Sequence, residues 1–296
     1  MPTMILSMLL SAVSSGVHQV EAIMIKKYNA KHKDGGFIFT ALISLFAMIF
    51  FFIIDRDGLC FPPLLIFYGA IAGVFYCVAS YLTFVALGCG PYLLSNLFLS
   101  YTLIFSIVYG LFVLKEPATV FTYIGIALML ISIFLVRNGK KAREGDDEKV
   151  KISLKWVISI LLSVIGSGMF GVMKKLQQVE FDKAYDNECM IVTYIFTFVT
   201  LMTIGLLRDG KNLFYILRHA GPYTAAAGVA NGVVNLLGLV VNGLIPISIG
   251  APMGSGVKIV ITFLISLIIF REKFTVKQIA GVVLGTMSLV LFNLKF

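Results

Sequence analysis

The chain has 296 residues, of which 59% are hydrophobic and 13% are charged, and it carries a formal net charge of +9. A water-soluble domain of this length needs more polar surface than that composition supplies, so an ordinary globular fold is excluded. Repeated apolar runs of roughly 18 residues or more match the thickness of a bilayer core and indicate an integral membrane protein. Because backbone groups find no water inside a bilayer, each run is expected to be a helix, giving an all-α protein.

The apolar runs predict ten transmembrane helices joined by short loops, with no soluble domain between them. In chain order, the predicted spans are Met4–Ile25, Phe37–Ile54, Leu64–Leu87, Tyr92–Leu114, Ala118–Val136, Leu154–Met173, Glu188–Leu207, Pro222–Leu244, Ile247–Phe270 and Val276–Leu294. We therefore expect a multi-pass protein of the cytoplasmic membrane.

The two halves of the chain share a sequence pattern. LLSAVSSG at 9–16 recurs as LLSVIGSG at 161–168, and KEPATVFTYIGIALMLISIFL at 115–135 aligns with REKFTVKQIAGVVLGTMSLVL at 271–291. A five-helix unit is thus predicted to occur twice. Because five is odd, the second unit enters the membrane from the opposite face, as in the inverted repeats of many secondary transporters. The predicted organisation is a first repeat at 1–136, a basic linker at 137–152 and a second repeat at 153–296.

This pattern resembles the drug/metabolite transporter superfamily, and specifically its EamA type. The resemblance covers nearly the whole chain and rests on the 5+5 helix count and on a glutamate where the fourth and fifth helices of each half meet, Glu116 and Glu272. An acidic side chain just before a helix also satisfies the free N–H groups of the first turn of that helix. These two glutamates are therefore expected to have either a structural or a functional role. The aromatic–glycine pair usual in the family's first helix is replaced by Ser15 and Gly16 in one half and by Ser167 and Gly168 in the other.

The distribution of Lys and Arg predicts the orientation in the membrane. The linker and the loops after the first, seventh and ninth predicted helices carry seventeen of these residues, and the other face carries six, including Lys174 and Lys175. The positive-inside rule therefore places the linker in the cytoplasm and both termini outside. The family resemblance implies the reverse, with the termini inside.

Polar side chains line one face of several predicted helices. Residues that recur at intervals of three, four, seven or eleven lie on the same face of a helix. These stripes contain His18 and Glu21 in the first span, Tyr76 and Ser80 in the third, and Asn231, Asn235 and Asn242 in the eighth. Facing amides, hydroxyls and phenols indicate a wet cavity. The alternative is hydrogen bonding between helices that serves packing alone.

Lys258 is the only charged residue between Ile247 and Phe270. It lies about eleven residues from either end of its span, too deep to reach the interface, and a central charge costs at least about 2.5–3.5 kcal/mol. We therefore expect it to face water, a carboxylate or an anionic ligand, with a static ion pair to Glu21 as the alternative. A lysine here is also similar to the sugar-phosphate and nucleotide-sugar branch of the superfamily, where it contacts phosphate. Ile259 replaces that branch's second basic residue.

These features predict a secondary transporter that moves a small polar metabolite, an amino acid or organic anion with or without a positive group, by alternating access at a midplane cavity. The predicted substrate-binding residues are Lys258, Asn231, Asn235, Asn242, Tyr76, Ser80, Thr102 (the counterpart of Lys258 in the first half) and His18, and Glu21 is the candidate for proton coupling. The alternative is a membrane-embedded enzyme or a flippase for lipid-linked substrates. An enzyme needs converging nucleophile, base and orienting groups, and the only such pair is His18 with Glu21.

No cofactor, metal or nucleic-acid partner is expected. Gly205–Asn212 matches a phosphate-binding loop except that Asn212 replaces the Ser or Thr, and it ends a membrane helix. The four cysteines lack the spacing of a metal or redox site, and the basic linker is read as an orientation signal rather than a nucleic-acid site. The expected partners are a small-molecule substrate and the lipid bilayer, with the chain a monomer or a homodimer.

Overall fold

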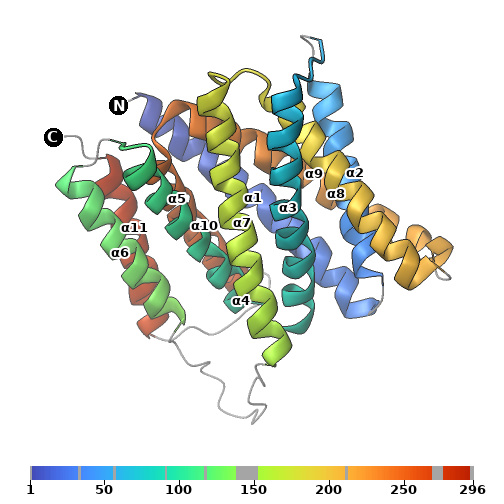
Figure 1. Cartoon of the computed structure of the whole chain (residues 1–296). Helices are drawn as coiled ribbons and strands as arrows, with labels where there is room; N and C mark the ends of the chain where they lie inside the picture. Colours follow the sequence, from blue (N-terminus) through green and yellow to red (C-terminus); the bar gives the residue numbers. More distant parts are fainter. Residues whose placement is uncertain are drawn as a thin grey trace, which may run out of the picture.

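The computed structural model describes residues 2–32, 35–55, 58–90, 92–116, 119–137, 153–210, 213–268 and 276–293. Within these ranges all regular structure is helical (Figure 1). The helices are α1 (Pro2–Lys31), α2 (Gly36–Ile54), α3 (Pro63–Cys89), α4 (Tyr92–Leu99), α5 (Leu103–Val108), α6 (Val120–Arg137), α7 (Leu154–Glu180), α8 (Asp186–Asp209), α9 (Leu213–Leu244), α10 (Ile247–Ile268) and α11 (Val276–Asn293). The 3-10 turn η1 (Ser100–Thr102) joins α4 to α5, and the π-helical turn η2 (Tyr109–Val113) follows, so 92–113 forms one helical segment.

Seven of the described helices, α1, α2, α3, α7, α8, α9 and α10, are long and apolar enough to cross a membrane. Shorter apolar helices occupy Ser100–Val113, Tyr123–Ser132 and Ile279–Ser288, within the other three predicted spans. The prediction of an all-α, multi-pass membrane protein is therefore confirmed at this level. The linker residues 138–152 and Glu272 lie outside the described residues.

Three helices extend at one end by six or more residues beyond the predicted spans, because polar residues that end an apolar run do not end a helix. α1 continues to Lys31, α7 continues to Glu180, and α9 begins at Leu213. The predicted start of the eighth span at Pro222 is wrong, since Pro222 lies inside α9. Membrane helices tolerate an internal proline when neighbouring groups satisfy the freed carbonyl.

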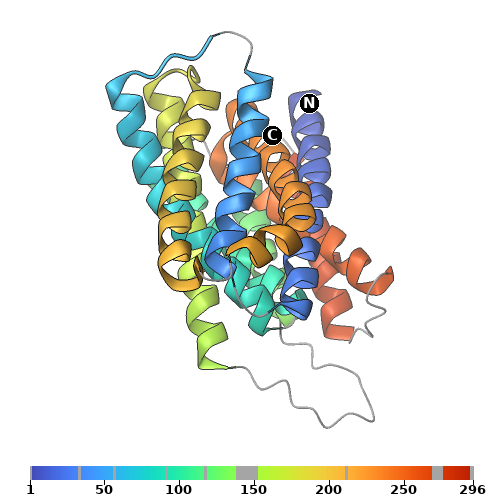
Figure 2. The same cartoon turned by 90° about the vertical axis from the view of Figure 1, so that its right-hand side faces the viewer.

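The helices form one bundle in which segments distant in sequence lie side by side (Figures 1 and 2). α1 packs against α9 and α10, α3 packs against α7 and α8, α2 packs against α8 and α9, and α6 packs against α11. The start of α1 and the end of α11 lie at one face of the bundle, and the end of α6 and the start of α7 lie at the opposite face (Figure 1). We call these the terminal face and the linker face.

Two glycines bring helix backbones into close contact. A Cβ added at Gly228 of α9 would lie 2.7 Å from the backbone oxygen of Ile43 in α2, and one at Gly166 of α7 would lie 2.9 Å from that of Phe75 in α3. Small residues allow this approach, and in a membrane the resulting dispersion contacts hold helices together.

Glu116 caps the start of a helix, the structural role that the sequence left open, but the helix is α10 rather than α6. Its Oε1 accepts a hydrogen bond from the Ile247 backbone N–H and its Oε2 accepts one from Ser248, each at 2.9 Å. Glu116 therefore satisfies the free N–H groups at the start of α10, where the helix dipole also favours an anion. The expectation that it serves the helix following it in the chain, α6, is wrong, because the tertiary fold brings α10 closer.

Candidate functional site

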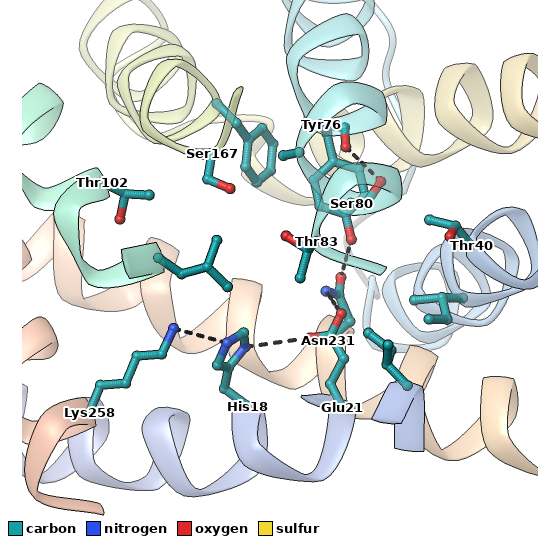
Figure 3. Close-up of a pocket in the computed structure, with 15 residues that line it drawn as sticks. His18, Glu21, Thr40, Tyr76, Ser80, Thr83, Thr102, Ser167, Asn231 and Lys258 are labelled. Atoms are coloured by element: carbon teal, nitrogen blue, oxygen red, sulfur yellow. Dashed lines mark hydrogen bonds and ion pairs between the residues drawn. The ribbon is translucent and has the colours of Figure 1, made fainter. Parts of the chain in front are cut away.

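A cavity with several polar side chains in its wall lies inside the bundle, between α1, α3, α7, α9, α10 and the η1 region (Figure 3). It has two adjoining lobes of about 180 and 340 Å³. The residues that line both lobes are His18, Leu99, Thr102, Ser167, Phe170 and Lys258. The smaller lobe also contains Glu21, and the larger one also contains Lys174, so we call them the Glu21 lobe and the Lys174 lobe.

Lys258, His18 and Glu21 form a continuous polar chain along the cavity wall (Figure 3). Lys258 Nζ lies 3.0 Å from His18 Nε2, and His18 Nδ1 lies 3.5 Å from Glu21 Oε2. An ammonium group can only donate, so Nε2 accepts, and a neutral imidazole then carries its proton on Nδ1, facing the carboxylate. His18 therefore separates Lys258 from Glu21, and the direct ion pair between them weighed from the sequence does not form.

Asn231 connects Glu21 to the rest of the polar network. Its Nδ2 donates to Glu21 Oε1 at 3.0 Å. Its Oδ1 accepts from the hydroxyls of Tyr76 at 2.8 Å and Tyr194 at 2.7 Å, and from Asn235 Nδ2 at 3.1 Å. Asn231 is only 6% exposed, so these bonds replace those that its amide would make in water. The amide holds α1, α3, α8 and α9 in register around the cavity.

A second lysine belongs to the site, and the sequence reading missed it. Lys174 Nζ donates to Asn235 Oδ1 at 3.0 Å and lies 4.7 Å from the centre of the Phe170 ring. The prediction that Lys174 and Lys175 belong to a loop is wrong, because α7 continues beyond both to Glu180. The signal was present in the sequence, since Ser163, Ser167 and Lys174 share one helix face at intervals of four and seven.

The structure places all nine predicted site residues around this cavity. The Glu21 lobe is lined by Tyr76, Ser80 and Asn231, and the Lys174 lobe by Asn235 and Asn242. Two of them form hydrogen bonds that involve a backbone carbonyl: the Ser80 hydroxyl donates to the backbone carbonyl of Tyr76 at 2.7 Å, and the backbone carbonyl of Asn242 accepts from Lys175 of α7 at 2.8 Å. Tyr194, which the sequence did not single out, is fully buried and bonds to both Asn231 and Asn235.

Hydrogen bonds tie the helices together on the linker side of the Lys174 lobe. Gln19 Nε2 donates to Thr262 Oγ1 at 2.9 Å, and the Tyr92 hydroxyl donates to Gln19 Oε1. Nearer the linker face, Lys26 Nζ donates to the Gly90 carbonyl at 3.2 Å. We call these contacts the linker-side seal. The Lys174 lobe lies on the other side, between the first half of α1, the last turns of α7 and α9, and the first turns of α10.

The chain was compared with known proteins. No model of a protein family matches it, and no curated protein matches its sequence. A solved structure described only as "Crystal structure of protein" has a TM-score of 0.60 and 13% sequence identity, covering 96% of this chain and 94% of that chain. The likeness concerns the fold alone. It extends over nearly the whole of both chains, so the arrangement of the helices occurs in a known crystal structure.

Proposed function

We propose that the chain is a secondary transporter of the EamA type in the drug/metabolite transporter superfamily. It moves a small amino acid or organic anion across the cytoplasmic membrane by alternating access. The observation that carries this proposal is Lys258, whose ammonium faces an internal cavity with a neutral imidazole as its partner. A buried ammonium is stable only with a counter-charge or water, and an anionic substrate supplies the counter-charge.

The size and lining of the cavity fit a small solute. Its larger lobe, about 340 Å³, lies at the lower end of the roughly 300–1,000 Å³ range of small-molecule sites. Apolar residues such as Leu99 and Phe170 alternate in the wall with Thr102 and Ser167. A few polar groups on a mostly apolar wall orient a ligand without binding it too tightly to release.

The packing of the helices supports two inverted repeats of five helices. In a 5+5 arrangement α7 corresponds to α1, α8 to α2, and α9 to α3. α1 packs against α9 as α7 packs against α3, and α2 packs against α9 as α8 packs against α3. A two-fold axis in the membrane plane would relate these pairs, because each helix then packs against the equivalent of its counterpart's neighbour. Transporters with such inverted repeats hold their substrate near the interface of the repeats.

Filling the cavity should abolish transport and leave the fold intact. A Cβ added at Gly254, which lines the Lys174 lobe, would meet no atom within 4 Å. Gly254→Leu should therefore remove uptake of amino acids or organic anions into liposomes, without lowering the thermal stability of the purified protein. Gly16→Leu is the matched control, because Gly16 also has open space but lines neither lobe. Wild-type uptake by Gly254→Leu would contradict transport through this cavity.

The orientation predicted from the Lys and Arg distribution has its own test. Gly145 lies in the linker, outside the described residues. A single cysteine at Gly145, in a variant lacking the four native cysteines, should resist a membrane-impermeant maleimide in intact cells. The same cysteine should react once the cells are permeabilised. Rapid labelling in intact cells would place the linker outside and the termini in the cytoplasm.

A further inference from the structure

The Lys174 lobe is lined by two ammonium groups, Lys174 from α7 and Lys258 from α10. Within the described residues, each bonds to a neutral acceptor: Lys258 to His18 Nε2 and Lys174 to Asn235 Oδ1, both at 3.0 Å. Among the residues that the structure describes, neither lysine forms an ion pair with a carboxylate. An ammonium group has three donors, so both lysines keep donors for a further partner in the cavity.

Lys174 does not extend toward the terminal face, although it lies six residues before the end of α7. Its Nζ lies over the ring of Phe170, one turn deeper in the same helix, and bonds to Asn235, nine residues before the end of α9. A lysine near a helix end commonly extends to the interface, where its charge is hydrated. The inward direction of Lys174 brings its charge into the cavity.

The Glu21 lobe contains the opposite charge with an acceptor to spare. Glu21 is 9% exposed, and its Oε1 accepts from Asn231. Its Oε2 is buried and accepts no hydrogen bond within the described residues, and His18 Nδ1 lies 3.5 Å from it. A buried carboxylate oxygen without a donor is costly, so this atom is suited to a donor that arrives with the ligand.

From these three groups we infer that the substrate is an acidic amino acid, with two carboxylates and one ammonium group. The inference rests on the proposed transport function and names the substrate class of the same site. The α-carboxylate binds Lys258 and the α-ammonium binds Glu21, on either side of His18, while the side-chain carboxylate extends into the Lys174 lobe to Lys174. With a neutral His18, two lysines and one glutamate carry a net charge of +1. An acidic amino acid carries −1, so the occupied cavity is neutral, which a low-dielectric interior favours.

Three probes of similar size test the side-chain carboxylate and the ammonium group in binding measurements on the purified wild-type protein. L-glutamate has all of them, L-glutamine lacks the side-chain carboxylate, and glutarate lacks the ammonium group. We expect L-glutamate to bind roughly tenfold to a hundredfold more tightly than either, the range of a charge-assisted hydrogen bond. L-aspartate and L-2-aminoadipate then show which side-chain length fits the Lys174 lobe.

Two variants assign the contacts. Lys174→Met should reduce L-glutamate binding to the level of L-glutamine and leave L-glutamine binding unchanged. Lys155→Met is the matched control, because Lys155 lies in the first turn of the same helix, is exposed and lines neither lobe, and it should preserve the wild-type ratio. Glu21→Gln should weaken L-glutamate and leave glutarate unaffected.

The outcomes separate this inference from the proposed function. Equal binding of L-glutamate and L-glutamine by the wild-type protein would overturn the inference, and would still support transport of amino acids. Equal losses for both probes in Lys174→Met would do the same. If no amino acid or carboxylate binds the wild-type protein, both proposals fail. Should Lys174→Met not fold, the three-probe comparison on the wild-type protein decides the question alone.

Discussion

Replacing Lys258 with methionine should lower the affinity for the proposed anionic substrate roughly tenfold to a hundredfold. Charge-assisted hydrogen bonds contribute about 1.5–3 kcal/mol, and each 1.4 kcal/mol is tenfold in affinity. Methionine keeps the length of the side chain and removes a charge that is costly at membrane depth, so α10 should still insert and fold. Binding and liposome uptake, measured beside the melting temperature in detergent, separate lost affinity from lost structure. Lys258→Arg should recover only part of the affinity, because a planar guanidinium does not replace a compact ammonium.

The double variant Glu21→Gln with Lys258→Met distinguishes a substrate contact from scaffolding. If Lys258 and Glu21 only balance each other's charge across His18, Lys258→Met leaves the Glu21 carboxylate unpaired. The double variant removes that unpaired charge as well, so it should transport better than Lys258→Met. If Lys258 binds the substrate, the second substitution cannot restore the missing contact. Complete rescue would assign Lys258 to the scaffold.

Gly228→Ala should destabilise the protein more than any conservative change at the cavity. The new Cβ would lie 2.5 Å from Phe46 Cβ and 2.7 Å from the Ile43 backbone oxygen, so α9 and α2 must move apart. Overpacking of this kind costs typically about 1–3 kcal/mol, which corresponds to about 2–4 °C in melting temperature per kcal/mol for a larger domain. Thermal unfolding of the purified protein measures the effect.

Gly16→Ala is the control for that measurement. Its new Cβ would meet no atom within 4 Å, and alanine has a higher helix propensity than glycine by about 1 kcal/mol. Stability should therefore stay equal or rise slightly. If Gly228→Ala melts at the same temperature as Gly16→Ala, the contact between α2 and α9 is looser than these distances indicate.

The helices could be predicted because length and apolarity decide what crosses a bilayer, and neither depends on tertiary contacts. The stripes on α1 and α9 likewise predicted cavity residues, since the helical repeat alone places Asn231 and Asn235 on one face. The sequence failed where a boundary or a partner depends on the fold. Two adjacent lysines resemble the end of a span and so predict a loop at Lys174, although Asn235 and Phe170 hold it inside the bundle. The role of Tyr194 depends on α9 lying beside it, which the sequence does not show.

The linker-side seal has a mechanical consequence for the site. Gln19 follows His18 in α1, and Thr262 lies one turn after Lys258 in α10, so the same two helices carry the Gln19–Thr262 bond and the Lys258–His18 contact. Because both are continuous α-helices through these positions, a shift of one against the other that breaks the first contact must also change the second. A ligand that drew the Lys258 ammonium away from His18 would therefore be expected to alter the stability of the Gln19–Thr262 contact. If the proposed alternating access includes an opening toward the linker face, that opening and occupancy of the cavity would be thermodynamically linked, each changing the other by the same free energy.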